Sequence, residues 1–462
     1  MGRGLVVALT ALALAPAAQA GGPGMLIGAA EDIVKQSDPV KTKAELDLAK
    51  LGGLDTIRIT QVWKPGETAP SAGDLAVDRM VANAAELDGI RIFVSILHFG
   101  SRTTPLTAQD QRDVAAFSAA LAKGLPRVRD FIVGNEPNLN RYWLPQFGPA
   151  GEDVAAPAYV QLLAQTYDAL KGVSPSIRVW GGAVSPRGSD RPNTGRDTHS
   201  PTVFIQDMGA AYRASGRTAP IMDGFAFHPY EDSSSAPPDS THPNISTIAL
   251  ADYGKLVALL DAAFGPNLPI VYDEFGVETT VPAAKAGLYT GTEPPPTKPV
   301  DEVTQADYYR RAIQIAYCQP NVVGVFLFHT VDEQALLSWQ SGLYYLDRTP
   351  KLSRNAVAAA AAEAQRGVLG ACPGLQIRVK ARVDARGRLT CDVDCSYVAR
   401  LQRLPKRSTT FVIRGTALGR IPKQLRFGRA ARALYRITVV ATAPLNPGPP
   451  TVATSPAFLL SR

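Results

Sequence analysis

Two glutamates end the most compact apolar runs in the chain. Glu136 closes the run 131–135, and Glu274 closes the run 269–273. Each run predicts a buried strand, and a carboxylate at the mouth of such a strand is costly to desolvate. Two carboxyl groups on two strands of one domain are what hydrolysis of a glycosidic bond requires, one as acid/base and one as nucleophile or base. We therefore take this pair as the candidate catalytic centre.

The elements around the pair alternate between β-rich apolar runs and helical patterns. The predicted strands are 25–29, 56–60, 91–97, 131–134, 177–180, 224–227, 270–272 and 322–328. The predicted helices between them include 75–85, 109–122, 158–170, 201–214, 246–264 and 304–317, with a closing helix at 356–366. Eight such units predict an α/β fold, a closed (β/α)₈ TIM barrel, whose active site lies at the carboxyl ends of the strands. A doubly wound open sheet is less favoured, because no Gly-rich phosphate loop follows the first run.

The composition changes sharply near Cys372. From that residue onward the chain has 17 Lys and Arg residues and 3 Asp and Glu residues, whereas the rest has 31 and 38. Alternating runs at 375–383, 409–414, 433–443 and 451–459 predict a small all-β sandwich domain. We expect a catalytic domain at 24–368 and a basic domain at 373–462. The positive charge either keeps this domain soluble or binds it to an anionic cell-wall polymer.

The first twenty residues predict a signal peptide. Arg3 precedes the short apolar run 5–14, and Ala18-Gln19-Ala20 matches a cleavage pattern, which gives a signal at 1–20. No later run is long enough for a membrane span. We expect a secreted protein, extracellular or associated with the cell wall, that acts as a monomer and binds no nucleic acid.

The four cysteines favour disulfides in an exported protein. Four cysteines allow three pairings. Cys391 and Cys395 are close enough in sequence to form a small loop, in which case Cys318 and Cys372 would tie a late barrel helix to the segment that leaves the barrel. A zinc site is less favoured, because paired Cys-x-x-Cys units and a nearby His are missing.

The segments Asn135-Glu136-Pro137 and Glu274-Phe275-Gly276 carry a resemblance to a known superfamily. The chain resembles the retaining glycoside hydrolases of clan A, and looks most like the cellulase family, glycoside hydrolase family 5. In that superfamily an Asn-Glu pair closes the fourth strand and a Glu closes the seventh. The resemblance implies that Glu136 is the acid/base, that Glu274 is the nucleophile, and that Asn135 hydrogen-bonds the sugar 2-hydroxyl.

Further strand ends match the same superfamily. Arg58 fits its second-strand arginine, which would keep Glu274 ionised by charge pairing. His98 fits its third-strand histidine, and His228-Pro229-Tyr230 fits its sixth-strand His-x-Tyr pattern, with Tyr230 able to donate to Glu274. Either histidine could instead be a buried structural residue whose ring nitrogens are hydrogen-bonded within the core. Strand alternation predicts that Asp273, next to Glu274, points the other way.

The aromatic residues are the main departure from the family pattern. The family places a tryptophan at the end of the eighth strand, where this chain has Phe328, and we expect Trp339, eleven residues later, to supply the aromatic surface. Trp63 and Trp143 also follow predicted strand ends, where they would stack on sugar rings or pack a loop against the barrel. Trp180 lies inside the fifth strand and is expected in the core.

These observations predict a retaining β-glycoside hydrolase that uses a two-step double displacement on a polysaccharide, oligosaccharide or glycoside. Two alternatives stay open: a transglycosylase with the same site, and a non-catalytic carbohydrate-binding surface protein on the barrel scaffold. The chain has no G-x-S-x-G motif of serine hydrolases and no H-E-x-x-H motif of metalloproteases. We expect neither a metal nor a cofactor in catalysis.

Overall fold

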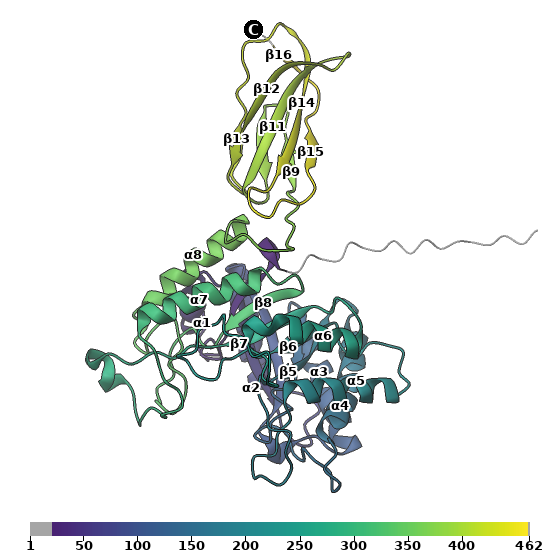
Figure 1. Cartoon of the computed structure of the whole chain (residues 1–462), viewed down its shortest axis with the longest axis vertical. Helices are drawn as coiled ribbons and strands as arrows, with labels where there is room; N and C mark the ends of the chain where they lie inside the picture. Colours follow the sequence, from purple (N-terminus) through teal and green to yellow (C-terminus); the bar gives the residue numbers. More distant parts are fainter. Residues whose placement is uncertain (1–20, 461–462) are drawn as a thin grey trace, which may run out of the picture.

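The computed structural model describes residues 21–460. A helix-covered barrel forms the larger part, and a narrow all-β domain projects from it (Figure 1). The predicted signal peptide at 1–20 lies outside the described residues. Within residues 21–460, no helix has the length and the apolar character that a membrane span needs.

The larger part is a closed barrel of eight parallel strands in chain order, as predicted. Its strands are β1 (Leu26–Ala30), β2 (Thr56–Trp63), β3 (Arg91–His98), β4 (Asp130–Val133), β5 (Arg178–Val184), β6 (Gly224–Phe227), β7 (Ile270–Phe275) and β8 (Val322–Leu327). Its helices are α1 (Pro39–Leu51), α2 (Ala72–Leu87), α3 (Ala108–Gly124), α4 (Ala155–Val173), α5 (Pro201–Ala214), α6 (Tyr253–Phe264), α7 (Glu302–Tyr317) and α8 (Leu352–Arg366).

The strands are apolar on both faces because each face is covered. Outward side chains pack against the helices in one large cluster of buried residues. Inward side chains, among them Phe93, Trp180 and Phe326, form a second buried cluster inside the barrel. Trp180 is therefore a core residue, as expected. This filled interior gives the groups at the mouth a rigid base.

The C-terminal β domain consists of two antiparallel sheets. One sheet has the order β13-β10-β9, and the other has the order β12-β11-β14-β15, with β16 also paired to β14. The strands are β9 (Ala381–Val383), β10 (Arg388–Cys391), β11 (Cys395–Arg403), β12 (Ser408–Ala417), β13 (Lys423–Gln424), β14 (Ala433–Thr442), β15 (Thr451–Thr454) and β16 (Phe458–Leu460). The all-β prediction is confirmed, whereas the domain limits of 24–368 and 373–462 stay predictions.

The strand predictions for the C-terminal β domain were incomplete. They omitted β11, which lies between β12 and β14 in the larger sheet. Its inward residues Tyr397, Ala399 and Leu401 are buried, but polar residues such as Arg400 alternate with them and dilute the apolar signal. The run 375–383 is a strand only at its end, and the run 451–459 divides into β15 and β16.

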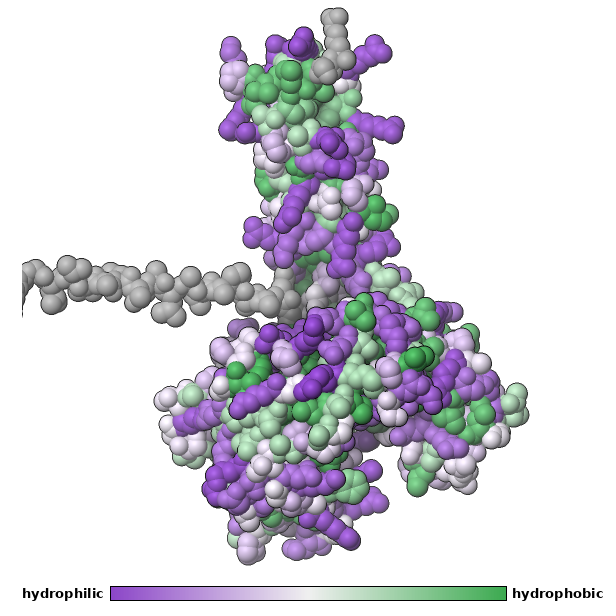
Figure 2. All heavy atoms as spheres, turned by 180° about the vertical axis from the view of Figure 1, so that it is seen from behind, coloured by the Kyte–Doolittle hydropathy of each residue, from purple (hydrophilic) through white to green (hydrophobic). Residues whose placement is uncertain are grey.

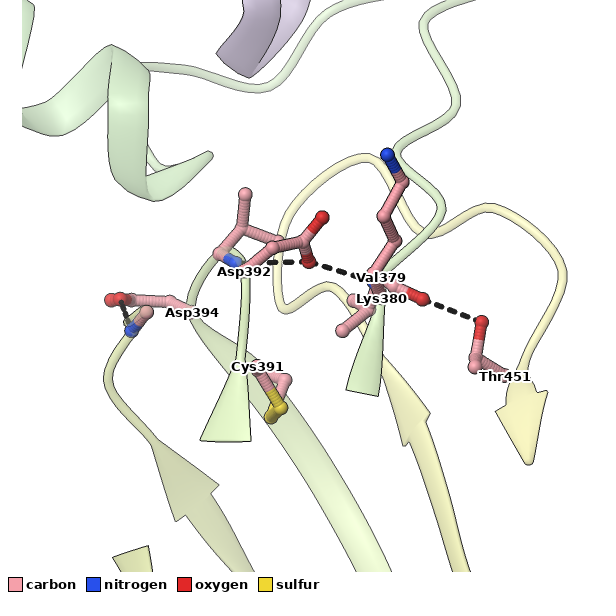
Figure 3. Close-up of a disulfide and its surroundings, with 9 residues drawn as sticks. Val379, Lys380, Cys391, Asp392, Asp394 and Thr451 are labelled. Atoms are coloured by element: carbon pink, nitrogen blue, oxygen red, sulfur yellow. Dashed lines mark hydrogen bonds between the residues drawn. A yellow bond between two sulfur atoms is a disulfide. The ribbon is translucent and has the colours of Figure 1, made fainter. Parts of the chain in front are cut away.

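Short-range bonds and one disulfide join the two parts. Cys318, at the end of α7, is bonded to Cys372, and Arg366 at the end of α8 forms an ion pair of 2.7 Å with Asp394. The second disulfide joins Cys391 and Cys395 around the turn that carries Asp394 (Figure 3). The turn between β10 and β11 is thus closed by a disulfide and attached to the barrel by a charge pair.

The two disulfides should differ in their effect on stability. Cys318 and Cys372 are 54 residues apart, and Cys391 and Cys395 are 4 apart. Because a longer closed loop removes more entropy from the unfolded chain, replacing the first pair with alanine should cost about 4 kcal/mol and the second about 2 kcal/mol. Urea unfolding of the two double variants tests this order. A larger loss for the Cys391/Cys395 variant would contradict it.

Candidate active site

Glu136 sits in a sharp turn just after β4. Gly134 has a φ of 91° and Glu136 itself has a φ of 40°, a left-handed conformation that is uncommon for a residue with a side chain. The turn is held by the Glu136 N–H, which donates to the Ala183 carbonyl of β5 at 2.7 Å. Strained backbone of this kind persists only where its surroundings fix it, and here it directs the carboxyl group to the barrel mouth.

Glu274 lies near the end of β7 and is 9% exposed. The Arg58 Nη1 donates to its Oε1 at 2.6 Å, and the Tyr230 hydroxyl donates to its Oε2 at 3.0 Å. Burial alone would raise the pKa of the Glu274 carboxyl, but the charges of His228 and Arg58 and the hydrogen bonds from Arg58 and Tyr230 hold this pKa below its ordinary value. Glu274 is therefore a carboxylate at neutral pH.

The fully buried imidazole of His228, just after β6, faces three carboxyl groups. Its Nδ1 lies 3.1 Å from Glu136 Oε1 and 3.5 Å from Glu274 Oε2, and its Nε2 lies 3.4 Å from Asp273 Oδ1. Burial favours the neutral ring, but the charges of Glu274 and Asp273 and the bonds to Asp273 and Glu136 outweigh it and raise the pKa of His228 to about 10. His228 is thus an imidazolium shared by both glutamates.

Asp273 does not point away from the site, so the prediction from strand alternation was wrong. Its side chain is fully buried, with Oδ2 at 3.5 Å from Arg58 Nη1 and Oδ1 at 3.4 Å from His228. The β7–β8 pairing shifts register between Tyr272 and Phe275, so the regular alternation fails at this position. The Asp273 carboxyl group therefore lies close to both cations of the site, Arg58 and His228.

Two adjoining cavities open at the mouth. One, of 620 Å³, is lined by Glu136, and we call it the Glu136 cavity. The other, of 590 Å³, is lined by Arg58 and Asn135, and we call it the Arg58 cavity. The two share four lining residues, namely Tyr142, Glu274, Phe328 and Glu333. Because Glu274 lines both, it stands where the cavities meet.

Four of the predicted substrate-binding residues line neither cavity: His228, described above, and Trp63, Trp143 and His98. Trp63 and Trp143 are each 1% exposed; the Trp63 indole N–H donates to the Glu67 carbonyl, and Trp143 packs edge-on against His98 at 5.6 Å. His98 is buried, and its Nδ1 bonds the Gly100 carbonyl at 2.9 Å. Burial lowers the pKa of His98 to about 4. Trp63, Trp143 and His98 are buried and absent from both cavity walls, so we interpret them as support for the loops around the mouth.

Trp339 lines the Glu136 cavity, and so do two residues that the sequence analysis did not name as site residues, Phe328 and Tyr142. Phe328 is the first residue after β8. Tyr142 lines both cavities, and burial followed by the charge of Glu136 raises its pKa to about 12. The sequence could have pointed to Tyr142, because it is an aromatic residue that follows Glu136 closely. The direction of its side chain, however, depends on how the loop folds.

Residues 21–460 contain no cluster of His, Cys, Asp and Glu arranged to hold a metal ion. At the centre of the mouth, the cations Arg58 and His228 lie within 3.5 Å of carboxyl oxygens of Glu136, Asp273 and Glu274. Such a set can transfer a proton, hold a carboxylate nucleophile and bind hydroxyl groups.

Comparison with solved structures shows a shared fold. The chain is similar to a family 39 glycoside hydrolase from the gut symbiont Bacteroides cellulosilyticus WH2, with 17% identity and a TM-score of 0.54 over 87% of this chain and 80% of that one. It is also similar to GH5_18 from Streptomyces cattleya in complex with GlcNAc, with 18% identity and a TM-score of 0.53 over 79% of this chain and 84% of that one. No protein-family model and no curated protein sequence matches the chain.

The charge on His228 should make its contribution to stability depend on pH. Its folded-state pKa of about 10 exceeds the unfolded value of about 6.5, so the contribution is complete below pH 6.5 and is lost as the pH rises through 10. The difference in free energy of unfolding between the wild type and His228→Gln should therefore decrease from pH 7 to pH 10. Urea unfolding at several pH values measures this gap.

His98→Gln is the matched control with the opposite sign. The folded-state pKa of His98 is depressed to about 4, so its contribution is present above pH 6.5 and declines as the pH falls below that value. If the difference in free energy of unfolding between the wild type and His228→Gln stayed constant up to pH 10, a charged His228 shared by the glutamates would be contradicted.

Proposed function

We propose that the chain is a retaining β-glycoside hydrolase that works by double displacement. The observation that carries this proposal is the convergence of Glu136 and Glu274 on one His228 nitrogen at the barrel mouth. The two oxygens lie 3.1 Å and 3.5 Å from that nitrogen, and such close placement of the two carboxyl groups supports the shorter spacing of a retaining enzyme. Retaining enzymes place their carboxyl groups about 5 Å apart, and inverting enzymes about 6.5–9.5 Å.

The first step uses the two glutamates in opposite protonation states. Glu274 is held by Arg58, Tyr230 and His228, which suits the nucleophile. Glu136 receives no bond from Arg58 and lines the Glu136 cavity, so we assign it the role of proton donor. Glu136 gives its proton to the leaving oxygen while Glu274 attacks the anomeric carbon and the glycosidic C–O bond breaks.

The second step releases the sugar with its original configuration. Glu136, now a carboxylate, takes a proton from a water molecule, and the water oxygen attacks the anomeric carbon of the glycosyl-enzyme. The ester bond to Glu274 breaks, and Glu274 returns to the carboxylate that Arg58, Tyr230 and His228 stabilise. Asn135 in the Arg58 cavity is the proposed partner of the sugar 2-hydroxyl.

The proposed substrate is a β-linked polysaccharide, oligosaccharide or glycoside, and the proposed location is outside the cell. Two disulfides suit an oxidising compartment. The solved neighbour GH5_18 is described in complex with GlcNAc. We extend from it only the class of ligand, a pyranose ring, to the cleft of this chain.

Two variants separate the proposed roles of the glutamates. Glu274→Gln should abolish turnover, because the amide is not a nucleophile. Glu136→Ala should slow cleavage of an unactivated glycoside by about 10²–10⁴-fold, yet largely spare the first step for a 2,4-dinitrophenyl glycoside, whose leaving group needs no proton. Rates on aryl β-glycosides of differing leaving-group acidity measure this. An inverted anomer as the first product in NMR would contradict the double displacement.

A second proposal concerns the C-terminal β domain, which we propose binds an anionic polymer of the cell wall. Within residues 21–460, Arg388 is the one basic side chain of this domain that forms an ion pair inside it, with Asp384 at 2.8 Å. Hydrophilic residues cover much of the visible face of the domain, and a hydrophobic patch lies toward its far end (Figure 2). Arg400 and Arg414 lie on its larger sheet with exposed side chains. Unpaired cations on one domain concentrate a polyanion around it.

The double reversal Arg400→Glu and Arg414→Glu should weaken binding of fluorescent dextran sulfate several-fold at low salt. The physical reason is the loss of attraction to an exposed cationic face, which salt screens. The matched control is Arg112→Glu with Lys123→Glu on the exposed side of α3. Binding that resists salt, or that falls equally in the control, would contradict a role for this domain's charge.

A further inference from the structure

The wall of the Glu136 cavity carries more acids than the catalytic pair. The other charged residues that line it are Glu231, Asp232, Glu278, Glu333, Arg141 and Arg187. Four of these six are acids and two are bases. Glu231, Asp232 and Glu278 do not line the Arg58 cavity, so this excess of negative charge lies on one side of Glu274.

Glu231, directly after Tyr230, is a buried acid without a hydrogen-bond partner. It is 9% exposed, and neither of its carboxyl oxygens accepts or donates a hydrogen bond within residues 21–460. The His242 Nε2 lies 3.9 Å from Glu231 Oε2, which is too far for a hydrogen bond, and the other ring nitrogen is bonded to Asp252 at 2.8 Å. A buried polar group without a partner is costly, so this side chain in a cavity wall points to a ligand.

Glu278 is a second buried acid of the same wall. It is 6% exposed, and its Oε2 accepts a bond from the Gln340 N–H at 3.3 Å. Its own N–H donates to the Ser234 hydroxyl at 2.9 Å, which attaches it to the loop that carries Glu231. Burial, and then the charges of nearby acids, raise the pKa of Glu231 and of Glu278 to about 8 each. Raised pKa values of this kind in a cleft are typical of functional groups.

The bases near this wall are engaged with other groups. The Arg187 Nη1 bonds the Asp232 carboxylate at 3.2 Å and the Glu231 backbone carbonyl at 3.4 Å. The Lys351 ammonium bonds the Asp332 carboxylate at 2.7 Å. In the described part of the chain, neither Glu231 nor Glu278 forms an ion pair with an arginine or a lysine. The wall is therefore complementary to a positive charge that the ligand itself brings.

We propose that the Glu136 cavity accepts a leaving group that carries a protonated primary amine, and that Glu231 and Glu278 bind this amine. The inference rests on the proposed function, because the group that Glu136 protonates must lie within its reach and hence in this cavity. A primary ammonium has three donors and one positive charge, which suits two carboxyl groups of one wall. An amino sugar with no acyl group on its nitrogen and a basic aryl aglycone share this chemistry.

Binding of the amine should also release protons. In the free protein at pH 7, the raised pKa values keep protons on Glu231 and Glu278. A bound ammonium favours the charged carboxylates, so part of this proton population passes to the solvent. A neutral ligand of the same shape releases none.

The test compares two substrates of nearly equal shape, a 4-(aminomethyl)phenyl and a 4-(hydroxymethyl)phenyl β-glycoside, with the full-length protein at pH 7. The ratio of their kcat/KM values should fall about tenfold in Glu231→Gln and in Glu278→Gln, because a bond to a charged group is lost. The ratio is unaffected by inactive protein, and the difference in leaving-group acidity is the same in every variant. The matched control is Asp239→Asn, which removes an exposed charge from the loop that carries Glu231 and should keep the ratio.

Calorimetry gives a readout that does not depend on turnover. Binding of 4-(aminomethyl)phenol, measured in two buffers of different ionisation enthalpy, should release protons from the wild type and fewer from Glu231→Gln. The neutral 4-(hydroxymethyl)phenol should release none. Glucosamine and glucose form the same comparison for a sugar. Proton release by glucosamine supports an amino sugar as the leaving group, and release by the aryl amine alone supports a basic aryl aglycone.

The outcomes separate this inference from the proposed function. If the wild type cleaves neither aryl glycoside in the gluco, manno and xylo configurations, the proposed function fails and the leaving-group role fails with it. Calorimetry then still shows whether the wall binds an amine. If both glycosides are cleaved and neither glutamine variant lowers the ratio, or Asp239→Asn lowers it equally, the amine site is wrong while the glycosidase proposal stands.

Discussion

The imidazolium of His228 lies among three carboxyl groups where almost no water reaches, and the rest of the barrel mouth is constrained by it. A buried charge is tolerated only when opposite charges and hydrogen bonds surround it. Arg58 and His228 both lie close to the carboxyl groups of Glu274 and Asp273, whereas Glu136 is close to His228 alone. The two glutamates thus share one cation and differ in the second.

The barrel supplies the geometry that this cluster needs. Residues from β2, the β4 turn, the segment after β6, and β7 are far apart in sequence, and closure of the sheet brings their carboxyl ends to one mouth. The packed layer of Phe93, Trp180 and Phe326 beneath them keeps the interior filled. Loops then divide the space above Glu274 into two cavities, and the loop with Trp339 lines one of them.

Much of the fold and of the candidate site could be predicted from the sequence, because both depend on the periodicity of apolar residues and on the order of the apolar runs. Eight apolar runs indicated the barrel. Glu136, Glu274, His228 and Tyr230 lie at or just after strand ends, and Arg58 lies within β2 with its side chain bonded to Glu274. The direction of Asp273 was wrong because an irregularity between Tyr272 and Phe275 lets Asp273 and Glu274 both face the site, which no local pattern records. Trp63 and Trp143 follow predicted strand ends but pack in the large buried cluster outside the barrel interior. β11 escaped detection because polar residues such as Arg400 alternate with its apolar ones. Side-chain direction in loops depends on tertiary contacts, so the cavities could not be predicted.

The central claim is that Glu274 forms a covalent bond with the sugar while Glu136 does not. The most direct measurement is mass spectrometry of the protein after incubation with 2-deoxy-2-fluoro β-glycosides that carry a 2,4-dinitrophenyl leaving group. The fluorine slows both steps, and the activated leaving group lets the first outrun the second, so the intermediate accumulates. We predict an added glycosyl mass on the peptide that contains Glu274. A label on the Glu136 peptide, or turnover of these glycosides with no covalent adduct, would contradict the account.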